Sequence, residues 1–171
     1  MTEGAATGSR AAPLTLRRAT DADAKAIAAV FSASFRLLSF LPMLHTAEED
    51  RRFVAGVVLK TCEVVVAEDD TGIVSFLARQ GEEVRLLYTR PDRIGQGAGG
   101  RLIEAAKASG VAALELWCFQ ANERARRFYE ARGFRPVRFT DGADNEERWP
   151  DVRYRWQRVG DTNEEQSPPA N

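Results

Sequence analysis

A run of closely spaced glycines is the chemically most informative feature of this chain. The segment 95–100, Gly-Gln-Gly-Ala-Gly-Gly, lies between an apolar strand pattern ending at Thr89 and a helical pattern that begins at Arg101. Glycine adopts backbone dihedrals that other residues avoid and leaves the main-chain N–H groups uncovered. Several such groups at the positive end of a helix can converge on an anion. The sequence therefore predicts a phosphate-binding loop.

Two common phosphate loops fit the flanking residues poorly. A Walker A loop needs Lys and then Ser or Thr after the last glycine, but Arg101 follows here. The dinucleotide fingerprint G-x-G-x-x-G does match residues 95–100, and Glu115 stands near the spacing of a ribose-binding acid. In that fold the strand runs almost directly into the first glycine, whereas residues 90–94 intervene here. The dinucleotide interpretation, and the nucleotide-dependent reductase it would imply, is therefore a weak third choice.

Two sequence blocks resemble the GNAT superfamily of N-acetyltransferases. Residues 87–102, LYTRPDRIGQGAGGRL, look like the family's coenzyme A signature. Residues 122–134, NERARRFYEARGF, resemble its Asn-x-x-Ala-x-x-Phe-Tyr-x-x-x-Gly-Phe segment. Two blocks in this order are more specific than one glycine loop, and a looser resemblance extends over residues 14–158. Ile94 departs from the family pattern, which usually has Gln or Arg before the first loop glycine.

The resemblance implies an enzyme that transfers an acetyl group from acetyl-CoA to a primary amine of a small molecule or peptide, by direct attack in a ternary complex. It implies that the backbone of Leu87, Tyr88 and Thr89 pairs with the pantetheine arm. An N–H near Leu87 or Tyr88 would face the oxyanion, and Arg93 or Arg101 could add positive charge at the loop. The pyrophosphate would rest on the N–H groups of Gly95, Gln96, Gly97, Ala98, Gly99 and Gly100.

Five polar residues are candidates for catalysis or ligand binding. Tyr129 coincides with the family tyrosine and is the predicted general acid, because a phenol with a pKa near 10 can protonate a thiolate whose thiol has a pKa of about 8.5. Glu83 matches a position where some members carry a catalytic base, with Glu82 as the alternative. Asn122 is either a helix cap or a ligand of the coenzyme arm. His45, the sole histidine, precedes a helix in the loop that family members use to shape the acceptor pocket.

Two further segments could form the acceptor site, although each has an ordinary structural explanation. The apolar stretch 37–44, with Trp149, Tyr154 and Trp156, would provide apolar walls or simply core. An acidic loop over residues 141–147 could attract a cationic amine or could be a solvated charged loop.

Composition is that of a soluble enzyme with one domain. The chain has 171 residues, 44% of them hydrophobic, and a formal net charge of −1, which gives no global attraction to nucleic acid or to anionic membranes. No apolar run approaches the roughly 20 residues of a membrane span, and the amino terminus lacks a signal-peptide pattern. Cys62 and Cys118 show no metal-ligand spacing. We predict a cytoplasmic protein that uses acetyl-CoA and no metal, and we leave a homodimer open.

Alternating patterns predict the elements that position these residues. We expect strands at 14–18, 62–68, 72–79, 83–89, 111–118, 134–139 and 151–157. Helices should begin near residue 24 and at the capping box Thr46–Glu49, and should span 99–109 and 122–132. The predicted fold is α/β (α+β): a GNAT-like mixed, twisted sheet of about seven strands flanked by about four helices. It would occupy residues 13–159, with disordered tails at 1–12 and 160–171.

A second functional hypothesis belongs to another class. The chain could be a non-catalytic acyl-CoA-binding sensor that keeps the glycine loop without the chemistry. The presence of Tyr129 favours catalysis, whereas Ile94 and the uncertain base leave the sensor hypothesis open.

Overall fold

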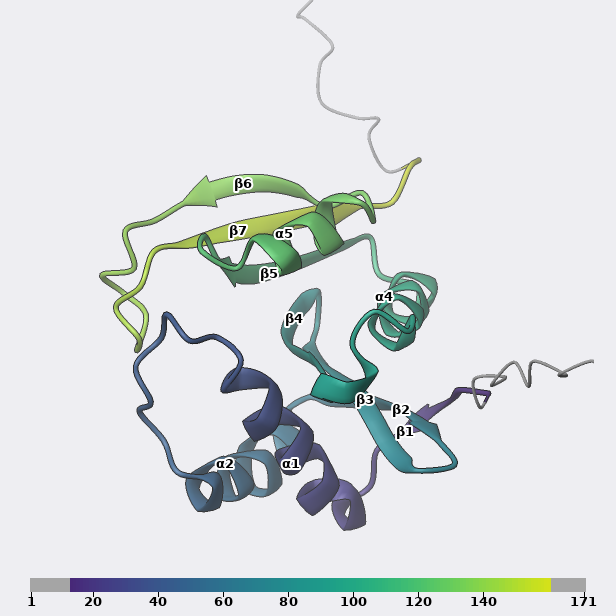
Figure 1. The fold of residues 1–171 in the computed structure, drawn as a ribbon. Helices are drawn as coiled ribbons and strands as arrows, with labels where there is room; N and C mark the ends of the chain where they lie inside the picture. The colour runs from purple at the N-terminus through teal and green to yellow at the C-terminus, as the bar shows by residue number, and fades with distance from the viewer. Residues whose placement is uncertain (1–12, 161–171) are drawn as a thin grey trace, which may run out of the picture.

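The computed structural model describes residues 13–160, so the predicted tail at 1–12 and all but the first residue of the predicted tail at 160–171 lie outside the described residues. Seven strands form one mixed sheet, as predicted, and their order in the sheet is β1-β2-β3-β4-β5-β7-β6 (Figure 1). The strands are β1 (Thr15–Arg18), β2 (Glu63–Asp69), β3 (Gly72–Gln80), β4 (Glu83–Thr89), β5 (Ala113–Phe119), β6 (Arg135–Phe139) and β7 (Asp151–Gln157). Their bounds lie within two residues of the expected ones.

Four helical stretches accompany the sheet. They are α1 (Ala24–Phe35), α2 (Ala47–Phe53), which continues through a π-helical turn (Val54–Val58) into α3 (Leu59–Thr61), α4 (Ala98–Ala108) and α5 (Glu123–Glu130). The predicted capping box at the start of α2 is confirmed. The Thr46 hydroxyl accepts a hydrogen bond from the Glu49 N–H, and the Glu49 carboxylate accepts one from the Thr46 N–H at 2.8 Å.

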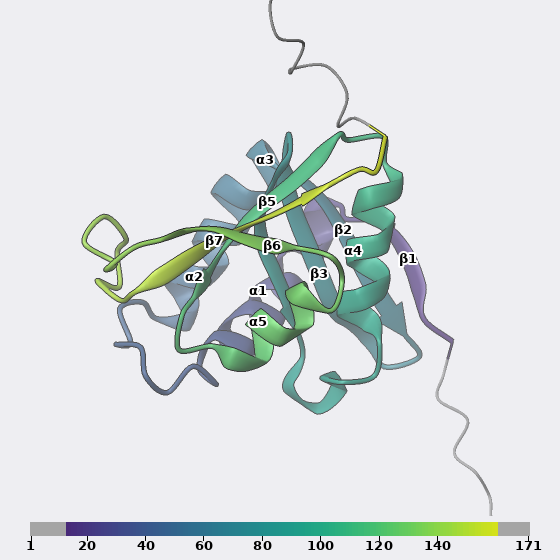
Figure 2. The ribbon, with the colours of Figure 1, turned by 90° about the horizontal axis from the view of Figure 1, so that it is seen from above.

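The central strands are apolar on both faces because helices cover both faces of the sheet (Figure 2). Side chains alternate across a strand, so Val66 and Phe76 pack under α1 and the α2 segment, whereas Leu77 packs on the other face with Leu102 of α4. Val66 and Phe76 are fully buried. This two-sided core holds β4 firmly along its β3 edge.

The parallel strands β4 and β5 pair at one end only. Their register contains a single pair, Glu83 with Glu115, and beyond it the strands diverge (Figure 1). Glu82 joins the two strands at this paired end, which we call the closed end. Its carbonyl accepts a hydrogen bond from the Glu115 N–H (2.9 Å), and its carboxylate accepts one from the Ala113 N–H (3.2 Å). The other edge of β5 pairs with β7 along its whole length. We call the gap between residues 84–89 and residues 116–119 the β4–β5 opening.

A β-bulge lies where β4 leaves β5. The β3–β4 register shifts between Ala78 and Arg79, which leaves Arg85 as the extra residue of β4. A bulge bends and twists its strand locally. The bend therefore occurs at the start of the opening.

Within residues 13–160, none of the helices has both the length and the apolar character needed to cross a bilayer.

Candidate active site

The backbone of β4 presents unpaired polar groups to the opening. The Arg90 N–H donates to the Val74 carbonyl at 2.7 Å, and residues of an antiparallel pair alternate between facing the partner and facing away. The backbone groups of Tyr88 therefore face β3, and those of Leu87 and Thr89 face the opening. The Thr89 carbonyl already accepts a hydrogen bond from the Ser34 hydroxyl. Leu87 is thus the residue whose N–H and carbonyl both face the opening without a neighbouring strand.

The glycine loop leads from β4 into α4 through left-handed turns. Gly95 has φ +82° and Gly97, the N-cap of α4, has φ +93°, a region that favours glycine. Among residues 13–160, no main-chain acceptor is bonded to the N–H groups of Gly97, Ala98, Gly99 and Gly100. The Gln96 N–H, by contrast, donates to the Arg93 carbonyl at 3.3 Å. Four consecutive donors at a helix N-terminus form an anion site.

The arginines nearest the loop in sequence are bonded elsewhere. Arg93 pairs with Asp69 and Asp92, both at 3.0 Å, and Arg101 donates to the Leu14 carbonyl at 2.6 Å. Neither guanidinium is therefore free to serve the loop in this structure.

Two arginines of the α5 segment lie beside the loop instead. A Cβ placed on Gly95 would lie 3.8 Å from Nη2 of Arg124, and one on Gly100 would lie 2.7 Å from Nη2 of Arg132. Arg132 is held there by Phe128, whose ring it covers at 3.8 Å and whose carbonyl it bonds at 2.9 Å. Positive charge therefore reaches the loop from a helix that is distant in sequence.

Tyr129 is buried at the junction of α5 with the sheet. Its ring packs against Phe128, Phe134 and Tyr154, with centroids 5.1, 5.6 and 6.2 Å away. Its hydroxyl makes no hydrogen bond within residues 13–160, yet no fully enclosed polar side-chain atom there lacks a partner. The hydroxyl therefore reaches open space. Burial raises the pKa of Tyr129 well above its usual range, and nearby Cys118 and Tyr88 add to the rise.

The predicted base and cap have clear structural positions. Glu83 lies half-buried at the closed end of the β4–β5 opening. Glu82, the alternative, is engaged with β5. The Asn122 side chain accepts the Ala125 N–H at 3.2 Å, which confirms its capping role. His45 forms a 2.9 Å ion pair with Glu146 on the surface.

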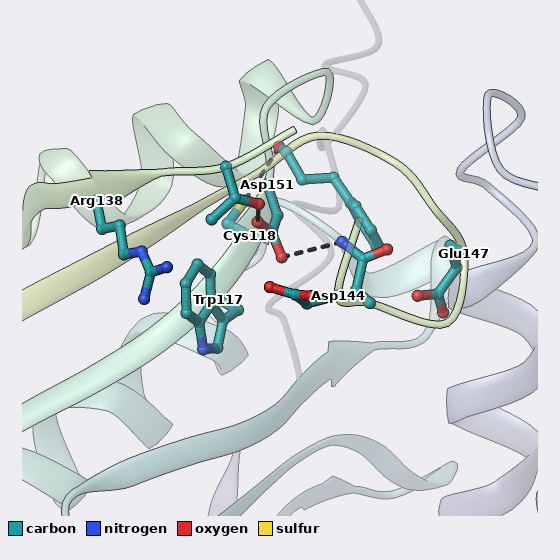
Figure 3. A pocket seen from close by; sticks show the side chains of 9 residues that line it. Trp117, Cys118, Arg138, Asp144, Glu147 and Asp151 are labelled. Carbon is teal, nitrogen blue, oxygen red and sulfur yellow. Dashed lines mark hydrogen bonds between the residues drawn. The ribbon is translucent and has the colours of Figure 1, made fainter. Parts of the chain in front are cut away.

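A cavity of about 390 Å³ lies on the β5 side of the opening. It is formed by the end of β5, the end of β6 and the β6–β7 loop (Figure 3). The lining residues are Trp117, Cys118, Phe119, Arg138, Thr140, Asp144, Asn145, Glu147 and Asp151. We call this space the β5 cavity.

The expected apolar walls are found only in part. Phe40, from the loop between α1 and α2, lies 6.0 Å from the Phe119 ring and 6.1 Å from the Trp149 ring. Tyr154 is fully buried core, and Trp156 packs beside Lys107 and Gly133. These two aromatic residues belong to the core, and neither lines the cavity.

The family comparison agrees with this geometry. Residues 60–136 match the family model described as an acetyltransferase (GNAT) domain. This part of the chain is therefore similar to GNAT acetyltransferase domains. A search of curated proteins found no match to the sequence.

Solved structures share the GNAT fold over most of this chain. The apo form of YjaB from Escherichia coli superposes with a TM-score of 0.70 at 23% identity, covering 84% of this chain and 97% of that one. YncA from Salmonella typhimurium, solved with its cofactor acetyl-CoA, gives 0.64 at 19% identity, covering 93% and 99%. The PaiA N-acetyltransferase from Thermoplasma acidophilum, solved with coenzyme A, gives 0.65 at 16% identity, covering 85% and 99%. The predicted fold class is confirmed.

The fold brings together residues that the sequence analysis did not connect. Arg124, Phe128 and Arg132 are spaced by four, so they share one face of α5, and this spacing was a usable signal. The Tyr88 side chain lies in an aromatic cluster with Phe31, 5.1 Å away, which no local pattern indicated. No cluster of three metal-ligating side chains occurs in the part of the chain that the structure describes.

Proposed function

We propose that this protein is an acetyl-CoA-dependent N-acetyltransferase that acts on a primary amine by direct attack. The observation that carries the proposal is the β4–β5 opening, which runs into the glycine loop. An unpaired strand edge can bind an extended pantetheine arm, and the loop at its end can bind the attached pyrophosphate. The β5 cavity, on the other side of the opening, would hold the acceptor amine.

The binding groups follow from the geometry. We assign the pantetheine contacts to the backbone of Leu87 and Thr89, with Tyr88 held against β3. We assign the pyrophosphate contacts to the main-chain N–H groups of Gly95, Gly97, Ala98, Gly99 and Gly100. The Asn122 amide N–H₂, which capping leaves unused, would face the coenzyme arm.

The chemistry requires three protein groups. The amine nitrogen attacks the thioester carbonyl carbon, and the Leu87 N–H stabilises the oxyanion that forms. Glu83 accepts the proton that the amine loses, directly or through water. When the C–S bond breaks, the Tyr129 hydroxyl donates a hydrogen bond to the departing thiolate, which then takes a proton from solvent.

Cys118 offers no covalent alternative in this proposal. Burial raises the pKa of its thiol to about 12, so it stays protonated near neutrality. Because the thiolate is the nucleophilic form, an acyl-cysteine intermediate is disfavoured. Direct attack by the amine is the simpler route.

The function is tested by thiol release from acetyl-CoA across a panel of primary amines. We expect release that depends on both enzyme and amine, with acetyl-CoA bound more tightly than NADPH in calorimetric titration. Acetyl-CoA binding without release on any amine would instead indicate the non-catalytic sensor. Preferential binding of NADPH would favour the dinucleotide interpretation of the loop.

Arg124 provides a prediction about cofactor affinity. Arg124→Ala should weaken acetyl-CoA binding by about tenfold, since one charge-assisted contact to phosphate contributes roughly 1.5–3 kcal/mol. The loss should shrink at high salt. Arg127→Ala is the matched control, because Arg127 lies on the same helix and pairs with Glu123 in solvent. Equal affinities of the two variants, measured by calorimetry, would remove Arg124 from the site.

Glu83 provides a prediction about proton removal. Glu83→Gln should lower kcat by about 10²-fold, the lower range for general-base catalysis. Glu82→Gln is the control, because a glutamine oxygen can still accept the Ala113 N–H. Wild-type activity of Glu83→Gln across pH 6–9 would show that water alone removes the proton.

A further inference from the structure

The β5 cavity is negatively charged. Its lining includes three carboxylates, from Asp144, Glu147 and Asp151, against one guanidinium, from Arg138. Trp117 and Phe119 provide its aromatic walls. A cavity of this volume, about 390 Å³, fits a small molecule. The charge of its lining therefore selects among small amines.

One of the three carboxylates has a structural role. Asp151 accepts hydrogen bonds from the Thr140 hydroxyl and from Nδ2 of Asn145 at 3.1 Å, and so fixes the β6–β7 loop. The loop shape also requires Gly142, which has φ +83° and where a Cβ would collide with the Trp149 backbone. Asp151 is thus already satisfied by protein donors.

The other two carboxylates are available to a ligand. Asp144 and Glu147 make no ion pair or hydrogen bond with residues 13–160, although neighbouring Glu146 is paired with His45. Figure 3 shows the Asp144 carboxylate pointing toward the Trp117 ring. Because Asp151 and Gly142 fix the backbone of the β6–β7 loop, the loop holds Asp144 and Glu147 beside the cavity.

The two free carboxylates lie toward different ends of the cavity. Glu147 lies near β4. After burial, its negative charge makes the largest contribution to the raised pKa of Tyr88, a residue of β4. Tyr88 lies on β4 at the opening, where the thioester would be bound. Asp144 lies instead beside Trp117 of β5. A molecule that spans the cavity from Glu147 to the Trp117 ring would meet both free carboxylates.

We propose that the acceptor is an organic dication, a primary amine with a second positive group a few bonds away. This inference rests on the proposed function, because it names the substrate of the same site. Glu147 would attract the reacting ammonium, and Asp144 with the Trp117 ring would bind the second cation. A free carboxylate on the acceptor would be repelled by Asp144 and Glu147, which outnumber Arg138.

Three amines of equal chain length test the charge of the second group: 1,4-diaminobutane, butylamine and 4-aminobutyrate. Their binding to the CoA-loaded protein is measured by calorimetry. We expect the diamine to bind about tenfold more tightly than butylamine, and 4-aminobutyrate to bind most weakly. The preference should decline between about 0.05 M and 0.5 M salt, as screening requires. Equal affinities, or tightest binding of 4-aminobutyrate, would overturn the inference.

Substitutions of single charged residues show which of them causes the preference for the diamine. Asp144→Asn should lower the affinity for the diamine about tenfold and leave that for butylamine unchanged. Glu146→Gln is the matched control, since it neutralises an adjacent carboxylate outside the cavity. A loss of amine binding in Arg138→Gln but not in Asp144→Asn would contradict the proposal. Because these readouts need no turnover, failure of the dication inference and failure of the acetyltransferase function are distinguishable.

Discussion

Replacing Tyr129 with Phe is expected to lower kcat by about 10² to 10³-fold, the range for loss of a positioned general acid. The dissociation constant of acetyl-CoA should stay within about twofold. The phenyl ring keeps the packing against Phe128, Phe134 and Tyr154, so only the hydroxyl is lost. Steady-state thiol release and calorimetry measure the two quantities. A variant with unchanged kcat would remove Tyr129 from the mechanism.

Tyr154→Phe is the matched control for this variant. Tyr154 lies 6.2 Å from Tyr129, and its hydroxyl donates to the Glu130 carboxylate at 2.5 Å. That hydroxyl also accepts a hydrogen bond from Arg126 at 3.2 Å, so removing it should cost about 1.5–3 kcal/mol of stability, the range for hydrogen bonds to charged groups, with little change in kcat. The pair of variants therefore separates a catalytic hydroxyl from a structural one in the same cluster.

The raised pKa of Tyr129 also predicts a pH dependence. Because burial favours the neutral phenol, Tyr129 stays protonated above its ordinary titration range. Any alkaline decline in kcat below pH 10 should therefore persist in Tyr129→Phe. A phenol this weakly acidic transfers its proton to a thiolate less readily than the sequence analysis assumed. It can still donate a hydrogen bond to sulfur as negative charge develops there.

Replacing Gly97 with Ala is expected to weaken acetyl-CoA binding at least about tenfold. Gly97 has φ +93° and lies at the start of α4, so a Cβ distorts the turn that aligns the N–H donors. No atom lies within 4 Å of the Cβ position, so the loss of affinity is expected from the distorted turn and not from a clash within the protein. Calorimetric titration with acetyl-CoA measures the effect.

Gly110→Ala is the control for backbone strain. Gly110 has φ +95°, with open space at its Cβ position, but follows the other end of α4. Both variants should lose about 1–2 kcal/mol of stability, because L-residues disfavour the left-handed region. Only Gly97→Ala should lose acetyl-CoA affinity. An equal loss in both would mean that strain, and not the loop geometry, controls binding.

The local elements were predictable because their signals lie within a few residues. The Thr46–Glu49 capping box started a helix, and strand alternation located all seven strands. The left-handed Gly95 and Gly97 agree with the expectation that the loop glycines adopt dihedrals that other residues avoid. Such features depend on dihedral preferences and on neighbours three or four residues away. The roles of Tyr129 and Glu83, the domain limits 13–159, a homodimer and a cytoplasmic location stay predictions.

The tertiary structure decided which of these groups meet. Arg93 and Arg101 adjoin the glycine loop in sequence but are bonded to Asp69 and Leu14, whereas Arg124 reaches the loop from α5. Trp156 could have lined the acceptor site and instead packs in the core.

The sequence by itself determined the elements, the glycine loop and the two family blocks, because each depends on residues that are near one another along the chain. Only the tertiary structure decided the β4–β5 opening and the β5 cavity. The opening exists because β5 pairs with β7 along its whole length and with β4 at a single position. Strand pairing over such separations is chosen by packing across the whole sheet, so no local pattern specifies it.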